Sequence, residues 1–175
     1  MKTAPIGLFY GSSTCYTEMA AEKIQQQFND GIVDIFNIAD TPIENFTRYQ
    51  QLILGIPTWD YGELQEDWEN IWEELDQIDL SQTTVALYGL GDQIGYPDWF
   101  LDAMGYLHHK VVERGAKIIG YWPNNGYQFL ESQALTDDKT QFLGLALDDE
   151  NDFDKTDERI TQWCNELKKH FTLER

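Results

Sequence analysis

Basic residues are scarce in this chain of 175 residues, where 12 Lys and Arg stand against 31 Asp and Glu and the net charge is −19. Such an acidic surface repels phosphate backbones and anionic lipid headgroups, so we expect neither nucleic acid nor a membrane as partner. The charge favours a docking face for basic partner proteins. Solubility through self-repulsion explains it equally well on composition alone.

Cysteine, histidine and long apolar runs are also scarce. Cys15 and Cys164 are far apart and show no metal or redox spacing, which favours reduced thiols and a cytoplasmic location. The apolar stretch 5–10 is too short to span a membrane, and a polar loop follows it rather than a cleavage site. His108 and His109 point in different directions on a helix, so we expect solvated side chains and no metal site.

Aromatic residues, in contrast, are abundant, with 6 Trp, 9 Tyr and 9 Phe. A chain of this length can bury roughly two-thirds of the surface that its unfolded form exposes. We therefore expect one globular domain over residues 1–175, without disulfide or metal support.

Short apolar runs alternate with segments of helical period along the chain. The predicted strands are 5–10, 31–36, 51–56, 84–89 and 117–122. The predicted helix faces are those of Ala20, Ile24 and Phe28; of Leu64, Trp68, Ile71, Trp72 and Leu75; of Phe100, Leu101, Met104, Leu107 and Val111; and of Ile160, Trp163, Cys164 and Leu167. This order predicts a doubly wound α/β domain whose parallel sheet is covered on both faces. Ligands of such sheets bind beyond the carboxyl ends of the strands.

Two segments interrupt the alternation. The polar, turn-rich stretch 123–141 separates the fifth apolar run from another at 142–147, so we interpret it as an insertion that splits the last strand. The acidic stretch 148–158 lacks the spacing of a calcium loop. We expect it to lead into a helix whose positive end it stabilises.

The loop after the first strand, in "GLFYGSSTCYTEMAAEKI" (7–24), gathers small hydroxyl residues. Ser12, Ser13, Thr14 and Thr17 lie where a helix begins and its first N–H groups are free. Hydroxyl and N–H donors can bind phosphate without the Lys of a Walker A loop. An ordinary helix N-cap explains the same residues equally well.

The loop after the third strand, "GIPTWDYGELQEDW" (55–68), places Trp59 at the mouth of the sheet. Its flat apolar surface suits stacking on a ring ligand. Gly62 lets the nearby backbone turn at little steric cost. The alternative is that Trp59 covers the helix that follows.

The loop after the fourth strand, "YGLGDQIGYPDWF" (88–100), contains three glycines but is not a dinucleotide fingerprint. The spacing of Gly89, Gly91 and Gly95 is one residue too long, and we expect the next helix to begin near Pro97 and Asp98. The glycines permit close approach of the backbone to a flat polar edge, with Tyr96 stacking opposite Trp59. On this stretch alone, an ordinary core or surface aromatic is the less favoured alternative for Tyr96.

Together the three loops predict a site for a phosphorylated planar ring. They contain no Lys or Arg, whereas acids stand in or beside them: Glu18, Asp60, Glu63, Asp92 and Asp98. Each acid about 10 Å away would repel a new negative charge by roughly 1 to 2 kcal/mol before salt screening. A ring that gains negative charge on reduction would therefore be harder to reduce.

These loops resemble the FMN site of the flavodoxins, and the resemblance covers essentially the whole chain. "YGSSTCYTE" is similar to the phosphate loop of that family, and "PTWDYGELQEDW" and "GLGDQIGYPDWFLDAMG" are similar to its two isoalloxazine loops. The insertion is typical of long-chain members, and the N-terminal stretch looks closest to the flavodoxin-2 group of proteobacteria. The resemblance implies a five-stranded parallel sheet of order 2-1-3-4-5.

The resemblance also implies noncovalent FMN, with its phosphate at the first loop and its ring between Trp59 and Tyr96. The peptide joining Asp60 and Tyr61 would accept a hydrogen bond from flavin N5 once it is protonated, and Gly91 and Asp92 would contact the pyrimidine edge. The cofactor-binding residues so expected are Ser12, Ser13, Thr14, Cys15, Tyr16, Thr17, Pro57, Thr58, Trp59, Asp60, Tyr61, Gly62, Leu90, Gly91, Asp92, Tyr96 and Asp98.

One departure from the family pattern concerns Cys15 and Tyr16, which stand where the phosphate loop usually has Gly and a polar residue. If that glycine serves a positive φ, Cys15 is strained and FMN affinity is altered. A redox role for Cys15 is disfavoured because the sequence places no cationic neighbour beside it to activate the thiol.

The sequence thus predicts a monomeric, low-potential, one-electron carrier between a flavin reductase and acceptor enzymes, with no catalytic residues of its own. An FMN-dependent NAD(P)H:quinone reductase is the first alternative, although Tyr96 should cover the face that nicotinamide needs. A phospho-acceptor receiver is the second, but it requires acids after the first strand, where this chain has hydroxyls and Cys.

Overall fold

The computed structural model describes residues 3–174, which form a parallel sheet between two helical layers. The central sheet has the order β2-β1-β3-β5-β6. Its strands are β1 (Ile6–Tyr10), β2 (Val33–Asn37), β3 (Gln51–Trp59), β5 (Thr84–Leu90) and β6 (Lys117–Ile119). Counted along the chain, these are the five predicted strands, and the predicted order 2-1-3-4-5 is confirmed.

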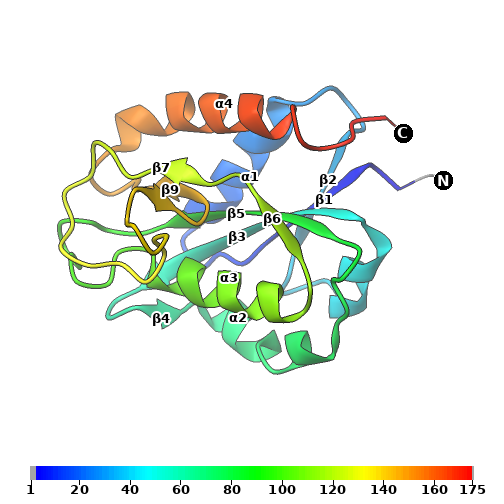
Figure 1. Ribbon diagram of the computed structural model, residues 1–175, viewed down its shortest axis with the longest axis horizontal. Helices are drawn as coiled ribbons and strands as arrows, with labels where there is room; N and C mark the ends of the chain where they lie inside the picture. Colours follow the sequence, from blue (N-terminus) through cyan, green and yellow to red (C-terminus); the bar gives the residue numbers. More distant parts are fainter. Residues whose placement is uncertain (1–2, 175) are drawn as a thin grey trace.

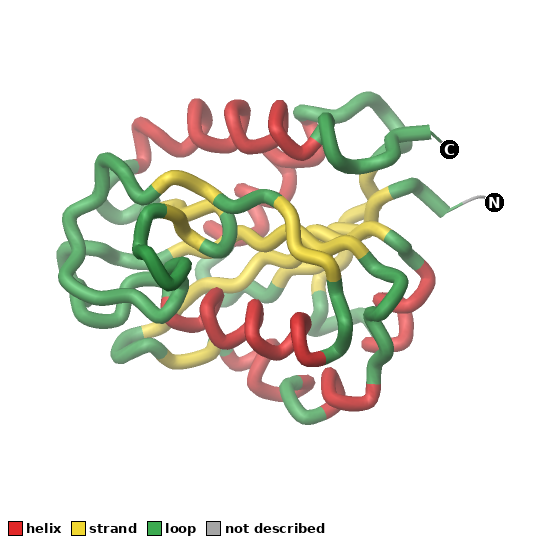
Figure 2. Tube along the Cα trace, viewed as in Figure 1, coloured by secondary structure: helices red, strands yellow, loops and turns green. Residues whose placement is uncertain are grey.

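The helices cover both faces of this sheet. Figure 1 shows α1 (Tyr16–Gln26) and α4 (Thr156–Leu167) on one side, and α2 (Glu66–Ile71) and α3 (Asp102–Glu113) on the other. Short 3₁₀ helices follow β2 and α2 and precede α4, at Ile43–Arg48, Glu74–Gln77 and Phe153–Lys155. The loops gather at one edge of the sheet, beyond the carboxyl ends of the strands (Figure 2). None of the helices in the part of the chain that the structure describes could cross a bilayer.

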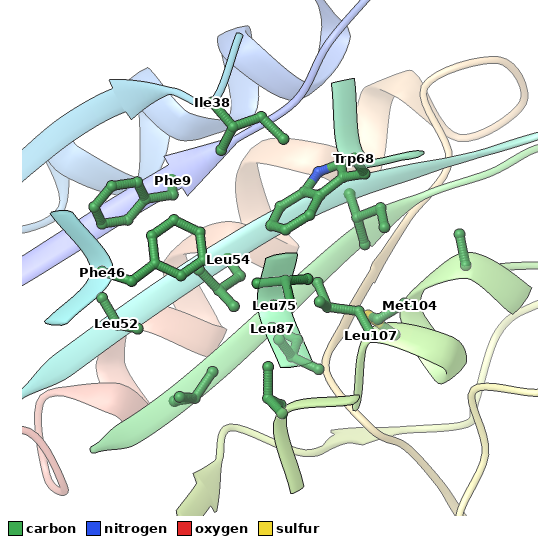
Figure 3. Packing of buried hydrophobic residues seen from close by; sticks show 14 of the residues in the cluster. Phe9, Ile38, Phe46, Leu52, Leu54, Trp68, Leu75, Leu87, Met104 and Leu107 are labelled. Atoms are coloured by element: carbon green, nitrogen blue, oxygen red, sulfur yellow. The ribbon is translucent and has the colours of Figure 1, made fainter. Parts of the chain in front are cut away.

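The strands read as continuous apolar runs because the helices bury both of their faces. All five residues of β1 are buried, as are Val85 to Leu90 in β5. On the face of α2 and α3, Trp68 and Phe46 pack with leucines of β3 and β5 (Figure 3). Residues of α1 and α4 form a second cluster on the other face.

The last strand is split, as predicted. β6 pairs in parallel with Thr84–Ala86, at the beginning of β5, and β9 (Leu145–Leu147) pairs in parallel with Tyr88–Leu90, at its end. The chain leaves the sheet at Gly120, whose φ of 83° suits glycine. The fifth strand therefore ends at Ile119, and the prediction that it reaches residue 122 was wrong. Trp122–Pro123 (β7) instead pairs antiparallel with Gln141–Phe142 (β8) inside the insertion.

Two predicted helices were also too long. Leu64 lies in the short strand β4 (Glu63–Leu64), which forms a hairpin with the end of β3, so α2 begins only at Glu66. The next helix, α3, begins at Asp102 rather than near Pro97 and Asp98. Turns occupy the intervening residues, and Leu101 in the left-handed region (φ 60°) separates them from the helix.

Candidate functional site

A cavity of about 220 Å³ opens at the carboxyl ends of β1, β3 and β5, where the three predicted loops meet. Its wall is formed by Thr14, Tyr16, Thr17, Pro57, Thr58, Trp59, Asp60, Leu90, Gly91, Asp92, Tyr96, Asp149 and Glu150. The structure therefore brings together residues from all three loops, as the position of ligands in doubly wound sheets predicts.

Trp59 is held by a strand rather than by a flexible loop. β3 continues to Trp59 and turns through Asp60 and Gly62, both at positive φ, into β4, where Glu63 pairs with Trp59. The indole is half-buried, and its Nε1 is buried without a hydrogen-bond partner. This hairpin gives the cavity a flat and pre-positioned aromatic wall.

Thr58 connects this wall to α3. Its hydroxyl oxygen accepts a hydrogen bond from the backbone N–H of Ala103 at 3.0 Å. Because the first N–H groups of a helix have no partner within the helix, this bond caps α3 from the neighbouring strand. Thr58 therefore has a structural role as well as a place in the cavity wall.

The loop after β5 folds around the carboxylate of Asp92. Its Oδ1 accepts hydrogen bonds from the backbone N–H groups of Ile94 (3.2 Å) and Gly95 (2.7 Å), and its carbonyl accepts one from Tyr96 N at 3.0 Å. A Cβ on Gly95 would lie 2.3 Å from Asp92 Oδ2, so any other residue there would displace the carboxylate around which the loop folds. This tight turn presents Tyr96 to the cavity.

Tyr96 lies in an aromatic and acidic group at the rim. The ring of Tyr61 meets that of Tyr96 edge-on at 5.9 Å and that of Trp99 at 5.0 Å. The neighbouring Asp60 carboxylate raises the pKa of the Tyr96 hydroxyl, first through a hydrogen bond and then through its charge. Tyr96 therefore stays neutral at physiological pH, as an aromatic wall requires.

The first loop leads directly into α1. Thr14 and Tyr16 reach the cavity wall, as does the buried Thr17, whose carbonyl accepts a hydrogen bond from the Tyr88 hydroxyl. Cys15 has φ 69°, so the left-handed conformation expected for the usual glycine is present with a cysteine in it. The hydroxyl oxygen of Ser12 is buried and has no partner.

The remaining predicted residues lie near the cavity but not on its wall. Ser13 is exposed and accepts a hydrogen bond from Gln65 Nε2 at 3.0 Å, and Cys15 and Tyr61 are exposed. Asp98 is exposed beyond the rim, and Gly62 is buried in the hairpin turn. These five residues border the cavity, and their expected contacts with the cofactor stay predictions.

Sequence reasoning missed Asp149 and Glu150. We interpreted the acidic stretch 148–158 as leading into a helix, and Asp157 and Glu158 do lie in the first turn of α4. However, β9 ends beside β5, so the residues that follow it reach the cavity as well. The available signal was the position of these acids directly after the apolar run 142–147.

All the charged residues of the cavity wall are acidic. Asp60, Asp92, Asp149 and Glu150 contribute carboxylates, and no Lys or Arg is among the wall residues. Burial raises the pKa of Asp149, whose carboxylate accepts a hydrogen bond from the Thr156 hydroxyl. Of the acids expected near the ring, Asp60 and Asp92 lie on the wall, whereas Glu18 instead lies beside Tyr10.

Comparison with known proteins is decisive for the family. The family model described as Flavodoxin matches residues 8–163. The chain belongs to the flavodoxin family. It is 52% identical to Flavodoxin 2 of Escherichia coli (strain K12) over 170 residues, which cover 95% of this chain and 98% of that protein. It is 47% identical to a flavodoxin of Nostoc sp. over 168 residues, which cover 96% of this chain and 98% of that protein.

Solved flavodoxin structures are similar to the whole chain. The crystal structure of Fusobacterium nucleatum flavodoxin bound to flavin mononucleotide has a TM-score of 0.89 and 32% identity, and the match covers 95% of this chain and 98% of that one. The predicted flavodoxin fold and the predicted similarity to the flavodoxin-2 group are both confirmed.

Proposed function

We propose that the chain, acting as one domain, holds FMN noncovalently in this cavity and passes single electrons from a flavin reductase to acceptor enzymes. Membership of the flavodoxin family makes it an electron-transfer protein rather than an enzyme. The observation that carries the proposal is the meeting of a hydroxyl-rich helix start with Trp59 and Tyr96 in one acidic cavity.

The residues present fit FMN. Ser12 Oγ and Trp59 Nε1 are buried polar atoms without hydrogen-bond partners. Burying such atoms costs free energy unless a bound molecule supplies the missing partners. Ser12, Thr14 and Thr17, with the free N–H groups at the start of α1, provide neutral donors for a phosphate. Ser13, Cys15 and Tyr16 complete the same loop.

Trp59 and Tyr96 are the aromatic residues that would hold the two faces of the ring, with Pro57, Thr58 and Leu90 beneath its edge. The carbonyl oxygen of Asp60, in the peptide that joins it to Tyr61, would accept a hydrogen bond from a protonated ring nitrogen. The turn at Gly62 gives that peptide freedom to reorient. The backbone of Gly91 and Asp92 would contact the polar edge of the ring, with Asp98 outside it. Bound flavin supplies one-electron chemistry at a potential that the protein sets.

The acidic wall supports a low potential. Asp60, Asp92, Asp149 and Glu150 all disfavour an added negative charge in the cavity, and no cationic wall residue offsets them. The net charge of −19 would attract basic partners and speed their encounter. We propose that the protein works as a monomer in the cytoplasm, where Cys15 and Cys164 stay reduced.

The visible spectrum of the purified protein tests the cofactor. We expect a yellow protein whose flavin is released by acid precipitation and identified as FMN. A colourless preparation that takes up no added FMN would contradict the proposal.

Reduction kinetics test the role of carrier. We expect slow flavin reduction by NADPH alone and rapid reduction when a flavin reductase is added, with rates that fall as salt rises because charge governs the encounter. Rapid reduction by NADPH alone would favour an NAD(P)H:quinone reductase instead.

A further inference from the structure

Gln93 is a buried polar residue that does not line the cavity. Only 3% of it is exposed, although it lies beside Asp92 in the loop that carries Tyr96. Its backbone N–H donates to Asp148 Oδ2 at 3.0 Å, and its side-chain Nε2 donates to Asp152 Oδ2 at 2.8 Å. Its Oε1 accepts a hydrogen bond from the backbone N–H of Gln128. One residue thus joins the Tyr96 loop to segment 148–152 and to the insertion.

Asp148 is the second centre of this network. It is fully buried, and its two oxygens collect the N–H groups of Gln93, Glu150 (3.1 Å) and Asn151 (3.0 Å) and the side-chain amide of Asn151 (2.8 Å). Several N–H donors stabilise a buried carboxylate without a cation. The Asn151 amide also donates to Asp92 Oδ1 at 2.7 Å and so closes the network onto the cavity wall.

Arg159 anchors the network in α4. Its guanidinium donates to Asp152 Oδ2 at 3.3 Å and lies 4.2 Å from the ring centre of Tyr127 in the insertion. The Tyr127 hydroxyl in turn donates to the carbonyl of Ala146 in β9 at 2.7 Å. Loop, insertion and helix are therefore connected behind the cavity wall, and the side chains that connect them are mostly shielded from water.

Both segments that the network joins carry cavity residues. Asp92 and Tyr96 come from one segment, and Asp149 and Glu150 come from the other. The distance between these two segments therefore sets the width of the cavity on the Tyr96 side. If the network did not fix the segments, the ligand would have to order them on binding, at a cost in affinity.

We propose that Gln93 and Asp148 are positioning residues, which fix the Tyr96 loop against segment 148–152 and so set the affinity of the cavity for the flavin ring without touching it. The inference rests on the proposed function, because it takes FMN as the ligand.

Gln93→Leu tests this proposal, because leucine keeps the apolar bulk and removes both side-chain hydrogen bonds. Gln51→Leu is a matched control. Gln51 also joins distant segments, through Nε2 to the carbonyls of Pro5 (3.0 Å) and Thr172 (2.7 Å) and through Oε1 to Thr172 N (2.6 Å), but at the opposite end of β3. Dissociation constants are measured for FMN and for riboflavin by flavin fluorescence titration of the apoproteins.

We expect Gln93→Leu to weaken the binding of both flavins by about tenfold, as the loss of one or two net hydrogen bonds allows. The affinities for FMN and for riboflavin should fall by the same factor, because the phosphate loop is untouched. The visible circular dichroism of the bound ring should also change. Gln51→Leu should leave both affinities within about twofold of those of the unmodified protein.

Unchanged riboflavin affinity in Gln93→Leu would overturn the proposal, and so would an equal loss in Gln51→Leu. If Gln93→Leu does not fold, Asn151→Ala replaces it, since Asn151 is exposed and bridges Asp92 to Asp148. That variant should weaken the binding of both flavins by about threefold, and unchanged affinities would again overturn the proposal. An unmodified protein that binds no flavin would overturn the proposed function itself.

Discussion

The buried hydroxyl of Tyr88 in β5 donates a hydrogen bond to the backbone carbonyl of Thr17 in α1 at 2.9 Å. The bond joins the middle of the sheet to the first turn of the helix that begins at the candidate phosphate loop. Burial raises the pKa of Tyr88 well above its usual value, so the hydroxyl remains a donor at any working pH.

Tyr88→Phe should therefore destabilise the apoprotein by about 1 kcal/mol, since it removes one buried hydrogen bond and keeps the ring. Urea unfolding followed by tryptophan fluorescence measures the change. Tyr106→Phe, on the surface of α3, is the control and should change the free energy of unfolding little. Equal stabilities of the Tyr88 variant and the unmodified protein would show that the bond contributes nothing net.

Cys15→Gly should relieve strain, because a non-glycine residue at φ 69° occupies the left-handed region. Glycine also adds entropy to the unfolded chain, which opposes this gain. Cys15→Ala is the control, because it removes the thiol and keeps the strain. We expect the glycine variant to be more stable than the alanine variant by about 1 kcal/mol in urea. The reverse order would mean that the loop relaxes to another conformation.

Asp149→Asn should raise the potential for adding an electron to the bound flavin by tens of millivolts, because it removes one carboxylate from the cavity wall. Potentiometric titration at low and high salt measures the shift. Asp30→Asn, in the turn before β2 at the opposite edge of the sheet, is the control. A shift of the same size in both variants would indicate overall charge rather than the wall residue.

His108 is half-buried and lies 3.1 Å from the Tyr121 hydroxyl, so the expectation of a solvated side chain was wrong for this histidine. It should make the protein less stable in mild acid. Burial first, and the neighbouring His109 second, lower the pKa of His108 in the folded state. The unfolded chain then binds a proton that the folded chain does not, so stability falls as the pH drops through the ordinary histidine pKa near 6.5 and below. His108→Gln should flatten the stability profile between about pH 7 and 5. Parallel profiles for the two proteins would contradict this.

The strands and the three loops could be predicted because each leaves a local pattern in the sequence, whereas the order of the strands within the sheet came only from the resemblance to the flavodoxins. Apolar runs marked the strands, and the hydroxyls near Thr14, together with Trp59 and Tyr96, marked the wall. The residues at which the helices and strands begin and end were less predictable. Leu64 fits a helical period, yet it belongs to a hairpin, because strand β3 continues past the sheet edge and folds back on itself.

Asp149 and the Gln93 network could not be predicted for a different reason. They depend on where β9 pairs with β5, and no local pattern fixes the register of a strand that an insertion has split. Asp148 illustrates the difficulty, since an acid in a run of acids gives no sign that it is fully buried and bound by N–H donors.

Gln51 has a practical consequence. It holds the carbonyls of Pro5 and Thr172 with one amide nitrogen, so the first and last described parts of the chain emerge together, at the start of β3 and away from the cavity (Figure 1). A tag, an electrode linker or a fused reductase attached at either terminus would leave the aromatic rim open to electron exchange. Two such proteins could be joined in series through a short tether with both rims accessible.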